Sequence, residues 1–339
     1  MSSTAEEPTE ATTLLRRVLQ EVSTVIVGQQ AMVERTLISL VAGGHCLLEG
    51  VPGVAKTLAV STLASVVGGT FNRIQFTPDL VPSDIIGTRI YRPSTEAFDV
   101  ELGPVFANFV LADEINRAPA KVQSALLEVM SEKQVSLAGT TYPVPDPFIV
   151  IATQNPIESE GVYPLPEAQR DRFLLRVRVD HPRAHEEFEI LRRMSTTPPR
   201  PTQVLNLSDL LRLREQAQQV QVDQLVADYV VRLVMATREP AAYGLAPLQH
   251  VIEVGASPRA TLGLVAASRV LALLRGRAYV LPEDVQALVH DIVDHRLVLT
   301  FDALADGVTA ASVVDQILAA VPPPRVIWDD VPESAPARP

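Results

Sequence analysis

The stretch from Gly50 to Thr57 constrains the fold of this chain more than any other feature. It follows an apolar run predicted as a strand at 45–48 and precedes a helical run at 58–67 that ends in two glycines. A glycine-rich loop between a strand and a helix turns many backbone N–H groups toward one point, at the positive end of the helix dipole. The stretch therefore predicts a binding site for the phosphates of a nucleotide.

Each residue type in this loop has a predicted task. Lys56 would place its ammonium on the terminal phosphates of ATP, and the hydroxyl of Thr57 would bind Mg²⁺. Ala55 stands where the strict pattern has glycine, which we expect to be compatible with helical dihedrals at the helix start. An ordinary glycine turn is the alternative, and the Lys-Thr pair with both flanking elements argues against it. The predicted nucleotide-binding residues are Gly50, Val51, Pro52, Gly53, Val54, Ala55, Lys56, Thr57 and Leu58.

Apolar runs alternate with helical patterns in the first part of the chain. The runs predicted as strands are 45–48, 73–76, 109–112, 148–152 and 173–179. From residue 208 onward helical periodicity takes over, as in 225–237, 258–275, 282–295 and 308–320. The prediction is an α/β fold of the P-loop NTPase type, a parallel sheet with helices on both faces, followed by a smaller all-helical lid domain.

The length of 339 residues suggests two domains, because it exceeds what one hydrophobic core usually organises. A stretch with three prolines among seven residues, 196–202, marks the predicted linker. The predicted organisation is a mobile tail at 1–10, an α/β domain at 11–195, the linker at 196–202, a helical domain at 203–321 and a second mobile tail at 322–339.

Polar residues follow two of the predicted strands at the sheet edge where ligands bind. Asp113 and Glu114 end the strand at 109–112, and Asn155 follows the strand at 148–152. Asp113 would hold Mg²⁺ through water, and Glu114 would act as the general base on the attacking water. Taken alone, such a pair usually caps a helix or faces solvent, and a lone Asn before proline is usually a turn former. The neighbouring phosphate loop favours the catalytic interpretation.

Charge and composition exclude several classes of protein. The formal net charge is -11, from 29 Lys+Arg against 40 Asp+Glu, and no dense basic run offers a surface for nucleic acid. A single cysteine, Cys46, excludes an internal disulfide and is expected to be a buried structural thiol. The start of the sequence lacks the pattern of a secretory signal, and no run of about 18 apolar residues predicts a membrane span. A cytoplasmic location is expected.

The ordered set of motifs closely resembles the MoxR family of AAA+ ATPases. The matching stretches are Ile-Val-Gly-Gln at 26–29, the loop at 50–57, Phe-Thr-Pro-Asp-Leu-Val-Pro-Ser-Asp at 76–84, Asp-Glu-Ile-Asn-Arg-Ala-Pro at 113–119, Ala-Thr-Gln-Asn-Pro at 152–156, Leu-Pro-Glu-Ala-Gln-Arg-Asp-Arg-Phe at 165–173 and Gly-Ala-Ser-Pro-Arg at 255–259. The resemblance implies an ATPase that forms a ring, usually hexameric, with a helical lid that clasps the nucleotide between neighbouring subunits. Alanine at position 55 is common in this family.

The resemblance also assigns roles to single residues. Asn155 looks like the sensor-1 residue, and Arg172 resembles the arginine finger that enters the neighbouring subunit's site, with Arg170 as the alternative. Arg259, beside the helix start at 257–258, looks like a sensor-2 arginine that reaches the γ-phosphate. A further expectation is that Ile26 and Val27 pack on the adenine ring, although two β-branched residues are more often core.

Two inserts typical of this branch of AAA+ proteins are predicted as hairpins at 91–105 and 134–147. The first is expected to lack an aromatic pair, because Phe98 stands beside two acidic residues.

Three functions fit the sequence. The leading one is a chaperone-like ATPase that remodels or activates a partner complex, in which the partner often bears a von Willebrand factor A domain. A nucleic-acid motor of a related AAA+ branch is the first alternative, and the acidic charge argues against it. A P-loop kinase is the second, and the acid pair together with Arg172 argues against that.

Overall fold

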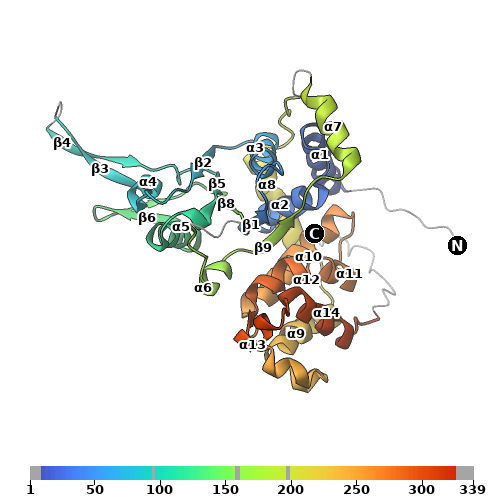
Figure 1. Ribbon diagram of the computed structural model, residues 1–339. Helices are drawn as coiled ribbons and strands as arrows, with labels where there is room; N and C mark the ends of the chain where they lie inside the picture. The colour runs from blue at the N-terminus through green and yellow to red at the C-terminus, as the bar shows by residue number, and fades with distance from the viewer. Residues whose placement is uncertain (1–8, 94–95, 157–160, 196–198, 326–339) are drawn as a thin grey trace, which may run out of the picture.

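A five-stranded parallel sheet forms the centre of the computed structural model, which describes residues 9–93, 96–156, 161–195 and 199–325 (Figure 1). The strand order is β2-β5-β8-β1-β9. These strands are β1 (Cys46–Gly50), β2 (Phe71–Gln75), β5 (Phe109–Asp113), β8 (Ile149–Gln154) and β9 (Leu175–Val179). All five predicted strands are present, with ends displaced by a residue or two.

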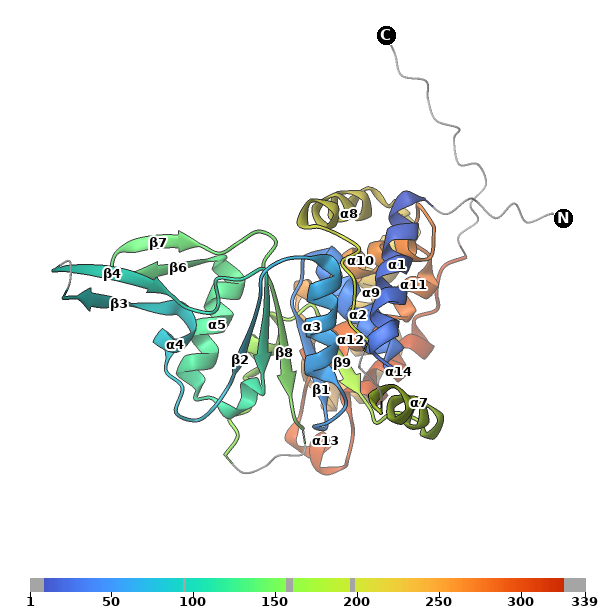
Figure 2. The ribbon, with the colours of Figure 1, turned by 90° about the horizontal axis from the view of Figure 1, so that it is seen from above.

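Helices cover both faces of this sheet, as predicted, which explains why its three central strands, β5, β8 and β1, are mostly apolar. Along β1, Cys46 and Leu48 pack into one core, whereas Leu47 packs into the other. The sheet separates α5 from α1, α2 and α3 in Figure 2. The helices of this part of the chain are α1 (Glu10–Val25), α2 (Gln30–Ala42), α3 (Lys56–Val67), α4 (Pro82–Ile86), η1 (Ile115–Arg117), α5 (Ala120–Glu132), α6 (Glu167–Arg170) and α7 (Ala184–Met194).

Two antiparallel hairpins project from the α5 side of the sheet (Figure 2). They are β3 (Gly87–Arg92) with β4 (Ala97–Leu102), and β6 (Gln134–Leu137) with β7 (Thr140–Pro143). The expectation that Phe98 lacks an aromatic partner is wrong, because the strand register places Tyr91 opposite it, with ring centroids 5.2 Å apart. Both rings are about half exposed, and the guanidinium of Arg89 lies 4.5 Å from the Phe98 ring centroid.

The C-terminal part forms the predicted helical lid, shown from yellow to red in Figure 1. Its helices are α8 (Leu207–Gln219), α9 (Gln224–Arg238), η2 (Pro240–Tyr243), η3 (Ala246–His250), α10 (Pro258–Leu274), α11 (Pro282–Gln286), α12 (Val289–Val293), η4 (Asp294–Arg296), α13 (Phe301–Ala305) and α14 (Ala310–Ala320). The lid is not all-helical, because β10 (Ile252–Val254) pairs with β11 (Val298–Leu299). Strands this short contain too few residues for an alternating pattern. The helix predicted at 282–295 is likewise divided into α11, α12 and part of η4.

The lid packs directly on the helices that cover one face of the sheet. Helix α10 contacts α1 and α2, and the side chains between them belong to one continuous apolar core. Cys46 lies in that core, where burial raises the pKa of its thiol to about 12, as expected for a structural thiol.

The domain boundaries remain a proposal, with domains at 11–195 and 203–321. Residues 1–8, 196–198 and 326–339, which include most of both predicted tails and part of the predicted linker, lie outside the described residues. In the ranges that the structure describes, no helix is both long and apolar enough to cross a membrane.

Candidate functional site

The phosphate loop connects the end of β1 to the start of α3, and its glycines are required for two different reasons. Gly53 has a φ of 86°, which side-chain-bearing residues rarely adopt. At Gly50 the reason is space, since a Cβ there would lie 2.4 Å from the carbonyl oxygen of Val179 on β9. Ala55 departs from the prediction: its φ of 63° is left-handed, because α3 begins only at Lys56 and Ala55 still belongs to the turn.

A cavity of about 380 Å³ opens over this loop at the carboxyl ends of the strands. Its lining consists of Pro52, Gly53, Ala55, Lys56, Thr57, Leu58, Arg73, Asp113, Glu114, Thr153 and Asn155. The Lys56 ammonium donates to the carbonyls of Gly50 and, at 3.4 Å, Gln154. Most of the residues predicted for the nucleotide, the metal and the chemistry thus surround one space. In the loop, Gly50, Val51 and Val54 are exceptions: Val54 is buried in the core, whereas Gly50 and Val51 line a neighbouring cavity.

The oxygens of Thr57 and Asp113 form a pair that fits Mg²⁺, which prefers hard oxygen ligands. The Thr57 hydroxyl donates to Asp113 Oδ2 at 3.2 Å, and Asp113 is buried at the floor of the cavity. Thr153 donates to the other carboxylate oxygen, Oδ1, at 2.6 Å. Arg73 on β2 donates to Oδ2 through Nε at 3.0 Å and Nη2 at 2.6 Å. A metal ion at Asp113 would therefore share this oxygen with the Arg73 guanidinium or displace it.

Glu114 occupies a constrained position at the end of β5. Its φ of 56° is left-handed, a conformation that costs free energy for a residue with a side chain and that clusters at functional sites. The Glu114 N–H donates to Thr153 Oγ1 at 2.8 Å. One oxygen of its carboxylate, Oε2, accepts from Gln75 at 3.0 Å and from Arg117 at 3.1 Å. The carboxylate is thereby held at the cavity wall.

Four of the residues that make these contacts had no role assigned from the sequence, namely Arg73, Gln75, Arg117 and Thr153. Thr153 is a polar residue that ends a buried apolar strand, and Arg73 is a charged residue at the start of a predicted one. A polar residue at the end of one apolar strand and a charged residue at the start of another were the features of the sequence that could have indicated these two residues. Gln75 gave no signal of its own, because its meaning depends on the strand register that pairs it with Asp113.

Arg172 and Arg259 lie away from the cavity of their own chain. Arg172 lies three residues before the start of β9. Between them, the N–H of Leu174 donates to the carbonyl of His45, at the amino end of β1. The five residues of β9 separate this end from the carboxyl end by roughly 16 Å, at about 3.3 Å per residue. Arg259 lies at the same end, where its guanidinium is 3.6 Å from Asp171.

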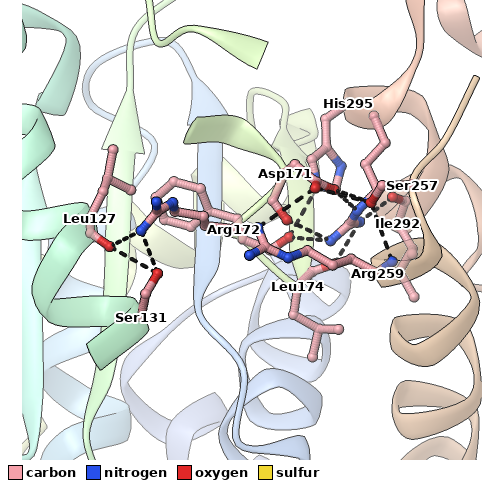
Figure 3. A network of polar contacts seen from close by, with 11 residues as sticks. Leu127, Ser131, Asp171, Arg172, Leu174, Ser257, Arg259, Ile292 and His295 are labelled. Atoms are coloured by element: carbon pink, nitrogen blue, oxygen red, sulfur yellow. Dashed lines mark hydrogen bonds and ion pairs between the residues drawn. The ribbon is translucent and has the colours of Figure 1, made fainter. Parts of the chain in front are cut away.

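The side chains of the two candidate fingers have local partners. Arg172 is half-buried and donates to the Leu127 carbonyl of α5 at 2.6 Å and to the Ser131 hydroxyl (Figure 3). Arg170 lies 3.7 Å from Glu167, within α6. The choice between Arg170 and Arg172 as the finger remains a prediction.

The predicted adenine contacts lie beside a different cavity. Ile26 is buried and lines a space of about 320 Å³ between α1 and α2, and Val27 next to it is half-buried. The same turn is tied to the end of β9, because the Gln29 side chain donates to the Asp180 carbonyl at 2.8 Å. The contact of Ile26 and Val27 with adenine remains a prediction.

A parallel five-stranded sheet with a phosphate loop, an Asp-Glu pair at a strand end and a C-terminal helical lid defines an AAA+ ATPase. Residues 45–175 match the model of the ATPase family associated with various cellular activities (AAA), and residues 248–317 match that of the AAA lid domain. The chain belongs to the MoxR family of these ATPases, which confirms the resemblance found in the sequence.

The similarity to individual proteins extends over most of the chain. Chaperone MoxR1 of Mycobacterium tuberculosis is 61% identical over 312 residues, which cover 92% of this chain and 83% of that relative. Protein MoxR of Methylorubrum extorquens is 32% identical, with 83% of this chain and 86% of the relative covered. The crystal structure of a candidate ATPase from Cytophaga hutchinsonii superposes with a TM-score of 0.87 at 46% identity, covering 92% of this chain and 95% of the other.

Proposed function

We propose that this protein hydrolyses ATP with Mg²⁺ and uses the reaction to remodel, assemble or activate a partner protein complex. The observation that carries the proposal is the single cavity around which Lys56, Thr57, Asp113 and Glu114 converge. A P-loop kinase would need a second substrate at the cavity, whereas an acid directly after the Mg-binding Asp favours water as the acceptor.

Each residue has one task in the proposed reaction. Lys56 exchanges its carbonyl partners for the terminal phosphates, while Thr57 and Asp113 hold Mg²⁺. Bound Mg²⁺ would neutralise charge on the β- and γ-phosphates. Glu114 would accept a proton from the attacking water as the oxygen of that water bonds to the γ-phosphorus, while the bond from this phosphorus to the bridging oxygen breaks and ADP leaves. Asn155 at the cavity wall would orient the water. Turning toward the water requires Glu114 to weaken its present contacts.

A neighbouring subunit completes this site in the proposed assembly, which is a homo-oligomeric ring with the hexameric stoichiometry usual in the family. Arg172 and Arg259 lie at the edge of the sheet opposite their own cavity, which supports their action on the nucleotide of the next subunit. A guanidinium there would stabilise charge that develops on the transferring phosphoryl group.

A protein is the proposed partner of the ring, in keeping with the name chaperone carried by the relative at 61% identity. We further propose that this partner protein bears a von Willebrand factor A domain. The ring is proposed to act in the cytoplasm and to bind no nucleic acid. The half-exposed rings of Tyr91 and Phe98 offer a protein-binding surface on the projecting hairpin. The net charge of -11 disfavours a DNA motor.

Two substitutions separate nucleotide binding from hydrolysis. Lys56→Ala should lose ATP binding, because it removes the cation that faces the phosphates, whereas Glu114→Gln should bind ATP and hydrolyse it far more slowly. Calorimetric titration and a phosphate-release assay measure the two properties. Lys121→Ala and Glu215→Gln, at exposed positions outside the cavity, are matched controls expected to behave as wild type. Equal loss of ATP affinity in Glu114→Gln and Lys56→Ala would rule out Glu114 as the base.

Mixing two inactive variants tests whether Arg172 acts between subunits. Arg172→Ala should keep ATP binding and lose about 10³-fold in turnover, the lower end of what an arginine finger contributes. Adding Lys56→Ala subunits should restore part of the activity, since they donate an intact Arg172 to the intact cavity of the other chain. Mixed rings that remain at background would show that Arg172 acts within its own chain or only structurally, and Arg170→Ala would then enter the same test.

A further inference from the structure

A buried arginine of the lid holds the turn that carries Arg172. The side chain of Arg296 in η4 is only 2% exposed. Its Nε donates to Asp171 Oδ1 at 2.9 Å, and its Nη2 donates to the carbonyl of Phe173 at 2.6 Å and, at 3.3 Å, to that of Asp171. Its Nη1 donates to the carbonyl of Leu174 at 3.3 Å. One guanidinium thus binds the backbone on both sides of Arg172.

Other lid residues bind the same turn. The Ser257 hydroxyl, at the start of α10, lies 2.9 Å and 3.0 Å from the two oxygens of Asp171. His295 Nε2 lies 3.2 Å from the carbonyl of Phe173. Burial lowers the pKa of His295 well below its ordinary value, so the ring is neutral and Nε2 is its donor, because a carbonyl only accepts. With Arg259, four lid side chains hold this turn (Figure 3).

The next residue of the turn is held from the opposite direction. The Arg172 side chain extends away from the lid to α5, where it meets Leu127 and Ser131 (Figure 3). Asp171 and Arg172 therefore attach one turn to two separate elements, the lid and α5. A movement of the lid relative to α5 would therefore strain or break one of these two sets of contacts.

We propose that Arg296 is a positioning residue for the ATPase reaction, which fixes the turn at 171–174 to the lid and so sets the place at which Arg172 is presented to the neighbouring subunit. The inference rests on the proposed function of Arg172. Arg296 itself is too buried to reach a neighbour's nucleotide, and its effect passes through the backbone that it binds. The planar guanidinium is suited to this task, because its fixed fork of donors reaches several acceptors at once.

Arg296→Lys tests the proposal, since lysine keeps the positive charge but cannot span these acceptors. We expect wild-type ATP affinity and a turnover roughly 10- to 100-fold lower, the scale of a catalytic group misplaced by about 1 Å. Mixing with Lys56→Ala subunits should restore turnover, because those chains donate a correctly held Arg172 to the intact cavity of the Arg296→Lys chain. Arg277→Lys is the matched control: Arg277 is a mostly buried lid arginine that pairs with Asp284, and this variant should turn over as wild type.

Restored turnover in demonstrably mixed rings distinguishes a fault in the donated arginine from general damage, which mixing cannot repair. Wild-type turnover in Arg296→Lys, or a loss that Lys56→Ala subunits do not restore, would overturn the inference. If Arg296→Lys does not fold, Ser257→Gly goes through the same test, because glycine preserves most of the helix cap while removing the hydroxyl bound to Asp171.

Arg172→Ala, measured in parallel, separates the proposed action of Arg172 between subunits from the proposed positioning role of Arg296. When Arg172→Ala is restored by mixing and Arg296→Lys is not, only the positioning role is wrong. Failure of Arg172→Ala to be restored removes the action between subunits, and the positioning role with it.

Discussion

Replacing Thr153 with valine tests whether the acid pair depends on its neighbours for its geometry. The hydroxyl of Thr153 bridges the two acids: it donates to the Asp113 carboxylate at 2.6 Å and accepts from the Glu114 N–H at 2.8 Å. Thr153 is 1% exposed, so both bonds are shielded from bulk solvent. Valine has nearly the same shape, and the substitution therefore removes the bonds without leaving a cavity.

The expected loss of stability follows from those two bonds. A hydrogen bond to a charged group contributes about 1.5–3 kcal/mol, and an unsatisfied buried N–H costs about 1–3 kcal/mol. Because the two effects share one hydroxyl and the loop can relax, we expect the free energy of unfolding to fall by about 2–4 kcal/mol. Groups that orient a metal ligand typically contribute about 10- to 100-fold to metal affinity or activity. In Thr153→Val we therefore expect a fall in ATPase turnover, or a rise in the Mg²⁺ concentration that turnover requires, by about 10- to 100-fold.

Urea denaturation measures the first effect, and phosphate release across a Mg²⁺ titration measures the second. Thr12→Val is the matched control, because the buried Thr12 hydroxyl also bridges elements, donating to the Leu273 carbonyl at 2.8 Å, but lies outside the cavity. That variant should lose about 1 kcal/mol and keep its turnover. Wild-type turnover at every Mg²⁺ concentration in Thr153→Val would refute the reasoning that this hydroxyl positions the acids.

Two further predictions concern stability. Gly50→Ala would place a Cβ 2.4 Å from the backbone oxygen of Val179, so β1 and β9 would have to separate. We expect the free energy of unfolding, measured by urea denaturation, to fall by about 1–3 kcal/mol. Unchanged stability would show that the two strands adapt freely. His290 lies 3.1 Å from Asp294 and 3.3 Å from Asp315, and the hydrogen bond to Asp294 raises its pKa above 6.5. The stabilisation by charged His290 is complete below pH 6.5 and is lost as pH rises through the pKa of the folded state. The melting temperatures of wild type and His290→Gln should therefore differ most at acidic pH. A difference in melting temperature that grows as pH rises would contradict this role of His290.

The parts of the site that the sequence predicted are those that depend on neighbours along the chain. The phosphate loop requires glycines, Lys56 and Thr57 within one turn between a strand and a helix, and the acid pair requires a strand end. Such local patterns leave little freedom, and the strands that carry them lie where they were expected.

The residues that the sequence missed depend on contacts between strands. Arg73 reaches Asp113 because β2 pairs with β5, and that register brings together residues 40 positions apart. The pairing of Tyr91 with Phe98 has the same cause, since it follows from the register of β3 with β4. No spacing rule within one segment contains this information.

The lid shows a third case, in which local structure was predicted and its placement was not. Ser257 caps α10 and Pro258 opens it, as expected from their residue types. The direction in which Arg259 points depends on how the lid docks, and docking is decided by contacts such as those of Arg296 with the turn before β9.

That docking has a consequence for how a ring of these subunits would work. Arg172 and Arg259 belong to different parts of the chain, yet Asp171 is adjacent to the first and lies 3.6 Å from the second. If both arginines act on the neighbour as proposed, a subunit would present them from one place, where the turn at 171–174 meets the start of α10. Under the proposed action of both arginines between subunits, displacement of the lid would move Arg259 directly and would disturb the contacts that hold the turn beside Arg172, so lid position would act on both arginines together.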